Sequence, residues 1–247
     1  EVLHSFVTRL GPDDQGAIAC QLYLEMLKSG YTAVGEFHYL HKDPSGAAYA
    51  DPAEMSRRLI IAAEQIGIGM TLLPVLYSVG GYRGVEINAG QRRYVLEVEK
   101  FIDQVSTLEG IATGNPSLRI GIAPHSVRQV PAEQMFDVLN GIQGIDPSMP
   151  VHIHAAEQVR DVDEHVAATG ARPVEWLLAN APVNEHWCLV HATHVNVDEV
   201  AGMATANAVA GLCPTTEANL GDGLFPLEAY LAQGGRWGIG SDSHISV

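Results

Sequence analysis

The segment Val151-His-Ile-His-Ala-Ala-Glu157 combines a predicted strand with three polar side chains. Side chains two residues apart in a strand lie on the same face, so His152 and His154 share a face and His154 lies at the carboxyl end. Glu157 follows in the loop, from which its carboxylate can fold back over that end. Two such histidines by themselves are typical of a buried, hydrogen-bonded core. Their interpretation therefore depends on the residues at the ends of the other strands.

Apolar, β-branched runs alternate with helical patterns, of period about 3.6, along the whole chain. The seven predicted strands are residues 32–39, 70–77, 118–124, 151–155, 187–191, 208–212 and 237–240. Between the first two, Asp51 as N-cap and Pro52 as first helical residue predict a helix that ends near Gly67. Strands that alternate with helices in this way are typical of a parallel α/β sheet, either doubly wound or closed into a barrel.

Polar residues at the strand ends distinguish these two folds. They are His38, His125, His154, His191 and Asp242. In a barrel the carboxyl ends converge on one mouth, where active sites form, whereas an open sheet spreads them apart. We therefore predict an α/β fold, a (β/α)8 TIM barrel, in which residues 1–247 form one domain from strands two to eight. The first strand is expected to be missing from this chain, because a helical pattern precedes residue 31.

Composition limits the class of partner. With 247 residues and 47% hydrophobic content, the chain can bury one large core. The formal net charge of −15 argues against binding to nucleic acid or an anionic membrane and favours a small ligand. The three cysteines form no CxxC pair, which indicates neither a disulfide framework nor a thiolate zinc site. This cysteine usage fits a reducing cytoplasm, and no apolar run reaches the roughly 18 residues of a membrane span.

Two further strand ends add groups that can bind a metal or move protons. His191 ends the strand 187–191, and Asp242 follows the strand 237–240. Two histidines and an aspartate at three strand ends can bind Zn²⁺ and leave a position for water, whose pKa the metal lowers to about 7. Asp242 can alternatively cap a following helix. Three other histidines are ambiguous, since loop histidines are usually solvated: His41, His194 and His244.

These residues carry a resemblance to a known family. His154 with Glu157, His191 and Asp242 are similar to the strand-five, strand-six and strand-eight residues of the amidohydrolase superfamily, in its deaminase branch. Three segments more narrowly resemble the formimidoylglutamate deiminases, the iminohydrolases of histidine degradation: residues 35–41, 153–160 and 211–223. The resemblance covers essentially the whole chain and implies a barrel of the metal-dependent hydrolase type.

The resemblance implies a metal site and a set of catalytic residues. His154 and Asp242 match zinc ligands for one ion per subunit, although such ligands also accept iron or manganese. Glu157, His191 and Asp242 match the catalytic residues. Asp242 would accept a proton as hydroxide forms, His191 would orient that hydroxide, and Glu157 would protonate the departing nitrogen.

The implied substrate is N-formimino-L-glutamate, which is hydrolysed to N-formyl-L-glutamate and ammonia. This small dianion needs local cations in an acidic protein, and arginine binds carboxylates through two donors. Tyr39, His125 and Arg128 match positions expected to bind its α-carboxylate. Arg128 can alternatively form a surface salt bridge at a helix cap. The oligomeric state is left open, with a homodimer as one alternative.

The chain departs from the family pattern at its amino end. The superfamily's HxH pair at the end of the first barrel strand has no counterpart before residue 31. The resemblance therefore implies that the chain begins after strand one and lacks the family's small terminal β-domain. With two of four zinc ligands, this segment alone is expected to bind metal weakly and to be inactive.

Two other functions stay open. A related deaminase acting on a nucleobase or another ring amidine would share the same strand-end residues, but Arg128 and the low content of Phe (five) and Trp (three) favour an acyclic dianion. A non-catalytic barrel used for binding is the second alternative. Glu157 and His191 argue against it, because a scaffold has no need of a proton shuttle at its mouth.

Overall fold

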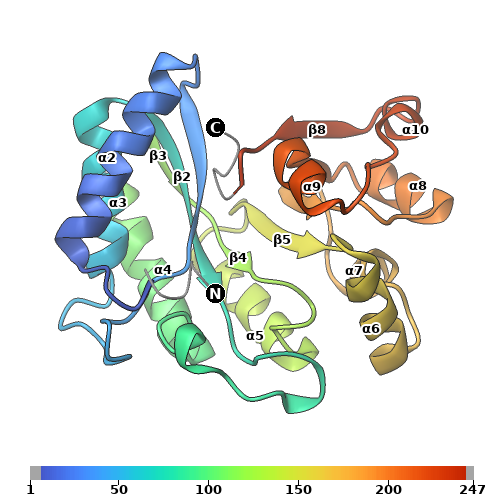
Figure 1. Ribbon diagram of the computed structural model, residues 1–247, viewed down its shortest axis with the longest axis horizontal. Helices are drawn as coiled ribbons and strands as arrows, with labels where there is room; N and C mark the ends of the chain where they lie inside the picture. The colour runs from blue at the N-terminus through green and yellow to red at the C-terminus, as the bar shows by residue number, and fades with distance from the viewer. Residues whose placement is uncertain (1–6, 243–247) are drawn as a thin grey trace. The chain divides into compact units, whose positions relative to one another are not determined.

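A computed structural model describes residues 7–242 of the chain (Figure 1). The chain divides into two compact units. The first unit comprises Glu1–Gly80, Val85–Ala123 and Glu133–Met149, and the second comprises Gly81–Gly84, Pro124–Ala132 and Pro150–Val247. That residues 1–247 form a single domain stays a prediction.

The first unit is built from parallel strands that alternate with helices along most of its length. Its helices are α2 (Pro12–Lys28), α3 (Glu54–Ile66), α4 (Val98–Ala112) and α5 (Ala132–Gln143). Its strands are β1 (Ala33–His38), β2 (Gly69–Leu76) and β3 (Leu118–Ile120), paired in the order β1-β2-β3, and the short β4 (Ala123–Pro124) also pairs with β2. Two short 3-10 helices follow β2 along the chain: η1 (Tyr82–Gly84), which belongs to the second unit, and η2 (Ala89–Gln91).

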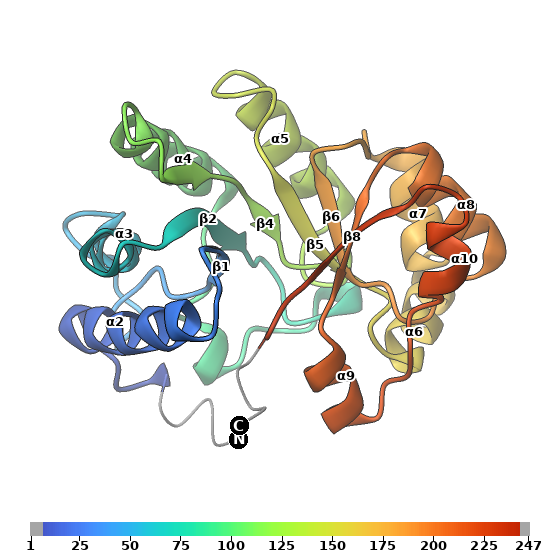
Figure 2. The same ribbon diagram turned by 90° about the horizontal axis from the view of Figure 1, so that it is seen from above.

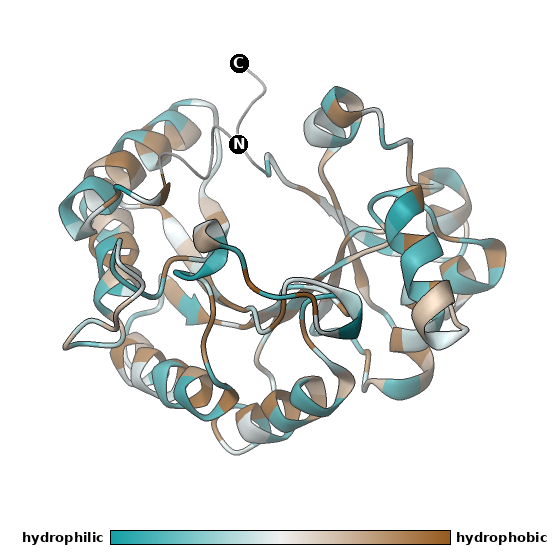
Figure 3. Ribbon diagram, turned by 60° about the horizontal axis from the view of Figure 1, so that its bottom comes forward, coloured by the Kyte–Doolittle hydropathy of each residue, from teal (hydrophilic) through white to brown (hydrophobic). Residues whose placement is uncertain are grey.

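Burial follows the predicted patterns in this unit. Strand β2 lies between two neighbours, and its residues Leu72, Leu73, Val75 and Leu76 are completely buried. Both faces of a central parallel strand are covered, so such a strand is a continuous apolar run. The helices are amphipathic instead, and Figure 3 shows their alternating hydrophobic and hydrophilic bands.

The start of α3 differs from the prediction. The helix begins at Glu54 rather than at Pro52, and Ala53 is its N-cap. The Asp51 carboxylate accepts a hydrogen bond from the Ala53 amide at 2.9 Å, so it closes a turn ahead of the helix. The predicted end is confirmed, because Gly67 is the C-cap, with a φ of 81° that favours glycine.

The second unit contains a four-stranded parallel sheet in the order β5-β6-β7-β8. The strands are β5 (Val151–Ala155), β6 (Trp187–His191), β7 (Val209–Leu212) and β8 (Arg236–Ile239). The connecting helices are α6 (Val159–Thr169), α7 (Pro173–Asn180), α8 (Val197–Thr205), α9 (Pro214–Leu220) and α10 (Leu227–Leu231). Figure 2 shows α6, α7, α8 and α10 on one side of these strands.

The predicted strands agree closely with the structure, except at residues 118–124. That run forms β3 and β4 as two short strands, although the Gly121 amide still donates to the Leu72 carbonyl of β2 at 2.9 Å. The strands 151–155 and 187–191 have the predicted bounds. No helix within residues 7–242 is long and apolar enough to cross a membrane.

Gly211 allows a close approach between β7 and β6. A Cβ atom at this position would lie 2.7 Å from Cys188 Sγ, which is shorter than any normal contact. A Gly211→Ala substitution should therefore lower the free energy of unfolding by about 1–3 kcal/mol. Urea unfolding of the full-length protein measures the change.

Gly110, in the exposed face of α4, provides the matched control. A Cβ atom there meets nothing within 4 Å, so Gly110→Ala should raise the free energy of unfolding by about 0.5–1 kcal/mol. If Gly211→Ala were as stable as the unsubstituted protein, the close approach would not constrain residue 211.

Candidate functional site

The carboxyl ends of the second unit's strands place the predicted site residues side by side. His154 is the penultimate residue of β5, and His191 ends β6, where it pairs with Ala155. The ring centroids of His154 and His191 are 5.6 Å apart. His125 directly follows β4 and stacks on His154 with centroids 4.9 Å apart. The β5–β6 register brings His154 and His191 together, and the stacked ring of His125 adds a third predicted histidine.

His154 has the hydrogen-bond pattern of a neutral metal-binding imidazole. Its Nδ1 lies 3.0 Å from the His125 carbonyl oxygen, which can only accept, so Nδ1 carries the proton and Nε2 carries the lone pair. Burial, followed by the charge of His191, lowers the pKa of His154 to about 4. A metal ligand of this type commonly donates its other nitrogen to a carbonyl. The donor chemistry of His154 therefore fits a divalent metal.

The loops after β5 and β6 stay hydrogen-bonded to each other beyond the strands. The Ala192 amide donates to the Ala155 carbonyl, and the His194 amide donates to the Ala156 carbonyl, both at 3.0 Å. Non-glycine residues in the left-handed region occur at Ala156 (φ 49°), His191 (φ 64°) and Ala192 (φ 48°). Such residues cost about 1–3 kcal/mol each and are typical of functional sites. The backbone turns there and brings the Glu157 side chain back toward β6.

Glu157 lies beside His191, and its predicted catalytic role stays a prediction. Its Oε1 lies 3.6 Å from His191 Nε2. Burial raises the pKa of Glu157 against the opposing effect of His191, and the negative charges of Asp161, Asp222 and Asp242 raise it further. A carboxyl group whose pKa is raised holds a proton closer to neutral pH, as a general acid must.

Asp242 lies in the same unit, beyond the end of β8. Its side chain is exposed, and its charge raises the pKa of both His154 and Glu157. Its alternative role as a helix cap involves residues 243–247, which lie outside the described part of the chain. His244 lies there too.

Four of the predicted site residues line one cavity of about 30 Å³. Its lining includes His125, Arg128, His154, Glu157, Asp161 and Tyr82. Burial, followed by the charge of His154, lowers the pKa of His125 well below its usual value, so its ring is neutral. The cavity has room for about one water molecule or one small polar group.

Arg128 forms a salt bridge, and its role in carboxylate binding stays a prediction. Its Nη1 forms a salt bridge to Asp161 in the first turn of α6, as the surface alternative requires. However, its Nε is buried and has no hydrogen-bond partner within residues 7–242. A buried donor without an acceptor costs about 1–3 kcal/mol. This nitrogen is therefore a position where a ligand acceptor would be stabilising.

Tyr39 and the histidines around it belong to the first unit. Tyr39 follows β1 and packs against Tyr94, with ring centroids 5.6 Å apart. Its role in carboxylate binding stays a prediction. His41 is not a solvated loop residue, because it is buried and its Nε2 lies 2.9 Å from the Val75 carbonyl oxygen. His38 is buried beside it.

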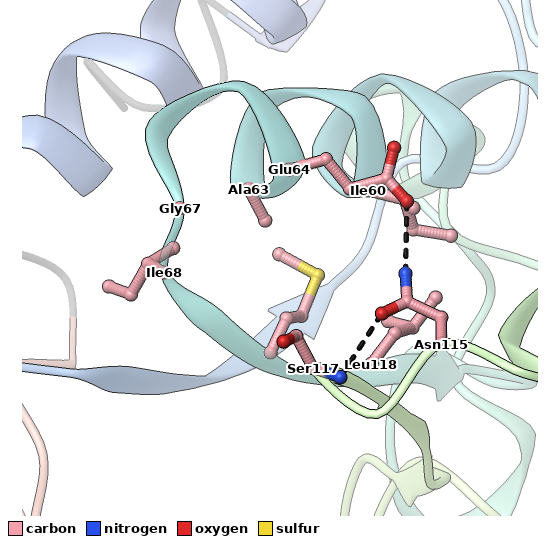
Figure 4. Close-up of a pocket in the computed structure, with 9 residues that line it drawn as sticks. Ile60, Ala63, Glu64, Gly67, Ile68, Asn115, Ser117 and Leu118 are labelled. Carbon is pink, nitrogen blue, oxygen red and sulfur yellow. Dashed lines mark hydrogen bonds between the residues drawn. The ribbon is translucent and has the colours of Figure 1, made fainter.

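A larger cavity, of about 340 Å³, lies at the other ends of the first unit's strands (Figure 4). Its lining includes Met70 and Leu118, at the amino ends of β2 and β3. The Glu64 carboxylate there accepts a hydrogen bond from the Asn115 amide at 3.0 Å. Sites in parallel α/β folds form at the carboxyl ends, so this cavity is not the candidate site.

Three residues of the site were not predicted from the sequence. Tyr82 and Asp161 line the small cavity, and Glu217 accepts a hydrogen bond from His191. Glu217 lies in the segment 211–223, which carries the family resemblance but contains no predicted site residue. Each of the three comes from a loop or helix start, where no periodicity indicates which side chain points inward.

Comparison with known proteins identifies the family. Residues 3–247 match the model of the amidohydrolase family. The chain is 52% identical to formimidoylglutamate deiminase from Pseudomonas aeruginosa, over 100% of this chain and 54% of that protein. It therefore spans about half the length of this relative.

Solved structures agree with this assignment. An amidohydrolase from Brucella melitensis is 44% identical with a TM-score of 0.95, covering 100% of this chain and 54% of that one. An adenosine deaminase from Xanthomonas campestris with bound zinc is 21% identical with a TM-score of 0.77, covering 96% and 48%, and it shows the fold alone. These matches confirm the predicted α/β fold class of the metal-dependent hydrolase barrels. The chain belongs to the amidohydrolase family.

Proposed function

We propose that the protein containing this chain hydrolyses N-formimino-L-glutamate to N-formyl-L-glutamate and ammonia. Water adds to the formimino carbon, the bond from that carbon to the terminal nitrogen breaks, and this nitrogen leaves with added protons as ammonia. The observation that carries the proposal is the convergence of Arg128 and His125 with Glu157 and His154 on one cavity. The 52% identity to a formimidoylglutamate deiminase supports the same reaction.

His154 and Asp242 are the residues proposed to hold a divalent metal, with zinc as the expected ion and iron or manganese as alternatives. His154 fits this role because it is neutral and its Nδ1 is held by the His125 carbonyl. A bound zinc ion supplies Lewis acidity, which lowers the pKa of water to about 7.

The chain's own residues would move the protons. Glu157, whose pKa is raised by burial, can hold a proton and deliver it to the departing nitrogen. The Nε2 atom of His191, 3.6 Å from Glu157 Oε1, lies where it can orient the attacking water. Asp242 accepts a proton as the water is activated.

Arg128 would bind a carboxylate of the substrate. The buried Nε of Arg128 has no acceptor within the described residues, and an α-carboxylate would supply one. Asp161 holds the guanidinium in place through Nη1. A cavity of about 30 Å³ accommodates the carboxylate end of the substrate and not its whole length. A cytoplasmic location and a homodimer stay predictions.

An Arg128→Ala substitution tests the carboxylate clamp. In the zinc-loaded full-length protein, the kcat/KM for ammonia release from N-formimino-L-glutamate should fall about 10- to 100-fold, because hydrogen bonds to a charged group are worth about 1.5–3 kcal/mol. Arg160→Ala is the control, since Arg160 lies exposed on α6 in a salt bridge to Glu164. Equal rates for the two variants would contradict the clamp, and turnover of guanine or cytosine instead would contradict the substrate.

A Glu157→Gln substitution tests the proton shuttle. The amide cannot deliver a proton to the leaving nitrogen, so kcat should fall by about 10²- to 10⁴-fold while KM changes little. Asp163→Asn makes the same chemical change on an exposed position of α6 and should leave kcat unchanged. Steady-state ammonia release measures both variants. A Glu157→Gln enzyme with the same kcat as Asp163→Asn would remove Glu157 from the mechanism.

A further inference from the structure

The segment Gly211–Gly223 places one buried carboxylate behind the candidate site. Glu217 in α9 is 3% exposed. Its Oε1 accepts a hydrogen bond from the Cys213 amide at 2.8 Å, and its own amide donates to the Cys213 carbonyl at 3.0 Å. The first of these hydrogen bonds orients the Glu217 carboxylate, and the second holds the backbone that carries it. This carboxylate is not part of the proton path proposed above.

The same oxygen atom determines the tautomer of His191. Oε1 of Glu217 lies 3.2 Å from His191 Nδ1, and both side chains are buried. Because Oε1 already accepts an amide hydrogen and an ionised carboxylate has no hydrogen to give, His191 Nδ1 must be the donor. In the Nδ1–H tautomer the lone pair lies on Nε2. That is the nitrogen 3.6 Å from Glu157.

We propose that Glu217 is a positioning residue that holds His191 in the Nδ1–H tautomer, with Nε2 directed at the attacking water. This proposal rests on the proposed function, because it takes His191 to be the residue that orients the attacking water. A carboxylate behind an imidazole fixes its tautomer and stabilises the imidazolium if Nε2 takes a proton. An amide in place of the carboxylate removes the charge and permits the other tautomer.

A metal site is the competing interpretation of the same three side chains. Ligand atoms of His191, Cys213 and Glu217 lie within 4.8 Å of one another. The hydrogen bonds favour the positioning role, because Oε1 of Glu217 already accepts from both His191 and the Cys213 amide. Burial also raises the pKa of the Cys213 thiol to about 12, which disfavours the thiolate that a metal requires.

The kinetic test compares Glu217→Gln with a matched buried carboxylate in the zinc-loaded full-length protein. Glu217→Gln should lower kcat about 10- to 100-fold with KM changed less than about threefold. The control is Glu199→Gln, because Glu199 is also buried but pairs with Arg172 and caps α8. It should lower stability and leave kcat unchanged. Equal kcat values for the two variants would overturn the proposal.

A double substitution separates positioning from general stability. If Glu217 acts through His191, adding Glu217→Gln to His191→Gln should cause no further loss of kcat. Additive losses would indicate a structural role and overturn the proposal. Metal content per chain provides the third readout, since a second bound ion that Glu217→Gln removes would establish the metal site instead.

The tautomer can be read directly, without any kinetic assumption. Nitrogen-15 NMR of the imidazoles, with His191 assigned by loss of its signals in His191→Gln, should show a protonated Nδ1 and an unprotonated Nε2. Glu217→Gln should change this pattern. A protonated Nε2 in the unsubstituted protein would overturn the proposal even if the variants failed to fold. If N-formimino-L-glutamate is not turned over but the tautomer is as stated, the proposed substrate is wrong and the positioning role stands.

Discussion

The candidate site depends on the hydrogen bonds between β5 and β6 and their continuation into the two following loops. The pairing of Ala155 with His191 is followed by two more backbone hydrogen bonds, from Ala192 to Ala155 and from His194 to Ala156. The connection passes through residues in the left-handed region, which is unfavourable for side chains with a Cβ. The paired strands below hold this strained backbone in place, so Glu157 Oε1 lies 3.6 Å from His191 Nε2.

Two histidines in the site each have Nδ1 against an oxygen acceptor, but the acceptors differ. His154 has its Nδ1 against a backbone carbonyl, whereas His191 has its Nδ1 against the carboxylate of Glu217. Both rings therefore direct Nε2 toward the site. A carbonyl behind His154 suits a ligand that stays neutral, and a carboxylate behind His191 suits a ring that exchanges a proton.

The charged residues around the cavity differ between the part that would face the formimino group and the part that would face a carboxylate of the proposed substrate. Burial raises the pKa of Glu157, and the negative charges of nearby aspartates raise it further, which favours a proton at the proposed formimino end. Arg128 is the guanidinium in the cavity lining, and its pairing with Asp161 leaves Nε without an acceptor among the described residues. In a chain with a formal net charge of −15, an oriented guanidinium offsets the repulsion that the proposed anionic substrate would meet.

The sequence by itself determined the strands 151–155 and 187–191, the end of α3 at Gly67 and the histidines at the strand ends. These features follow from alternation, apolar runs and a C-cap glycine, all of which are properties of a few consecutive residues. The same local reasoning placed the start of α3 at Pro52, because Asp51 resembles an N-cap although its carboxylate closes an earlier turn.

The tertiary structure alone decided which partners these residues have. Glu217 reaches His191 across 26 residues and Asp161 reaches Arg128 across 33. No spacing rule connects such pairs, because loop geometry sets the direction in which each side chain points. The 3.2 Å contact between His191 Nδ1 and Glu217 Oε1 indicates which nitrogen of His191 carries the proton. No pattern in the sequence indicates it. Sequence thus placed groups at the strand ends, and packing assigned them their hydrogen bonds.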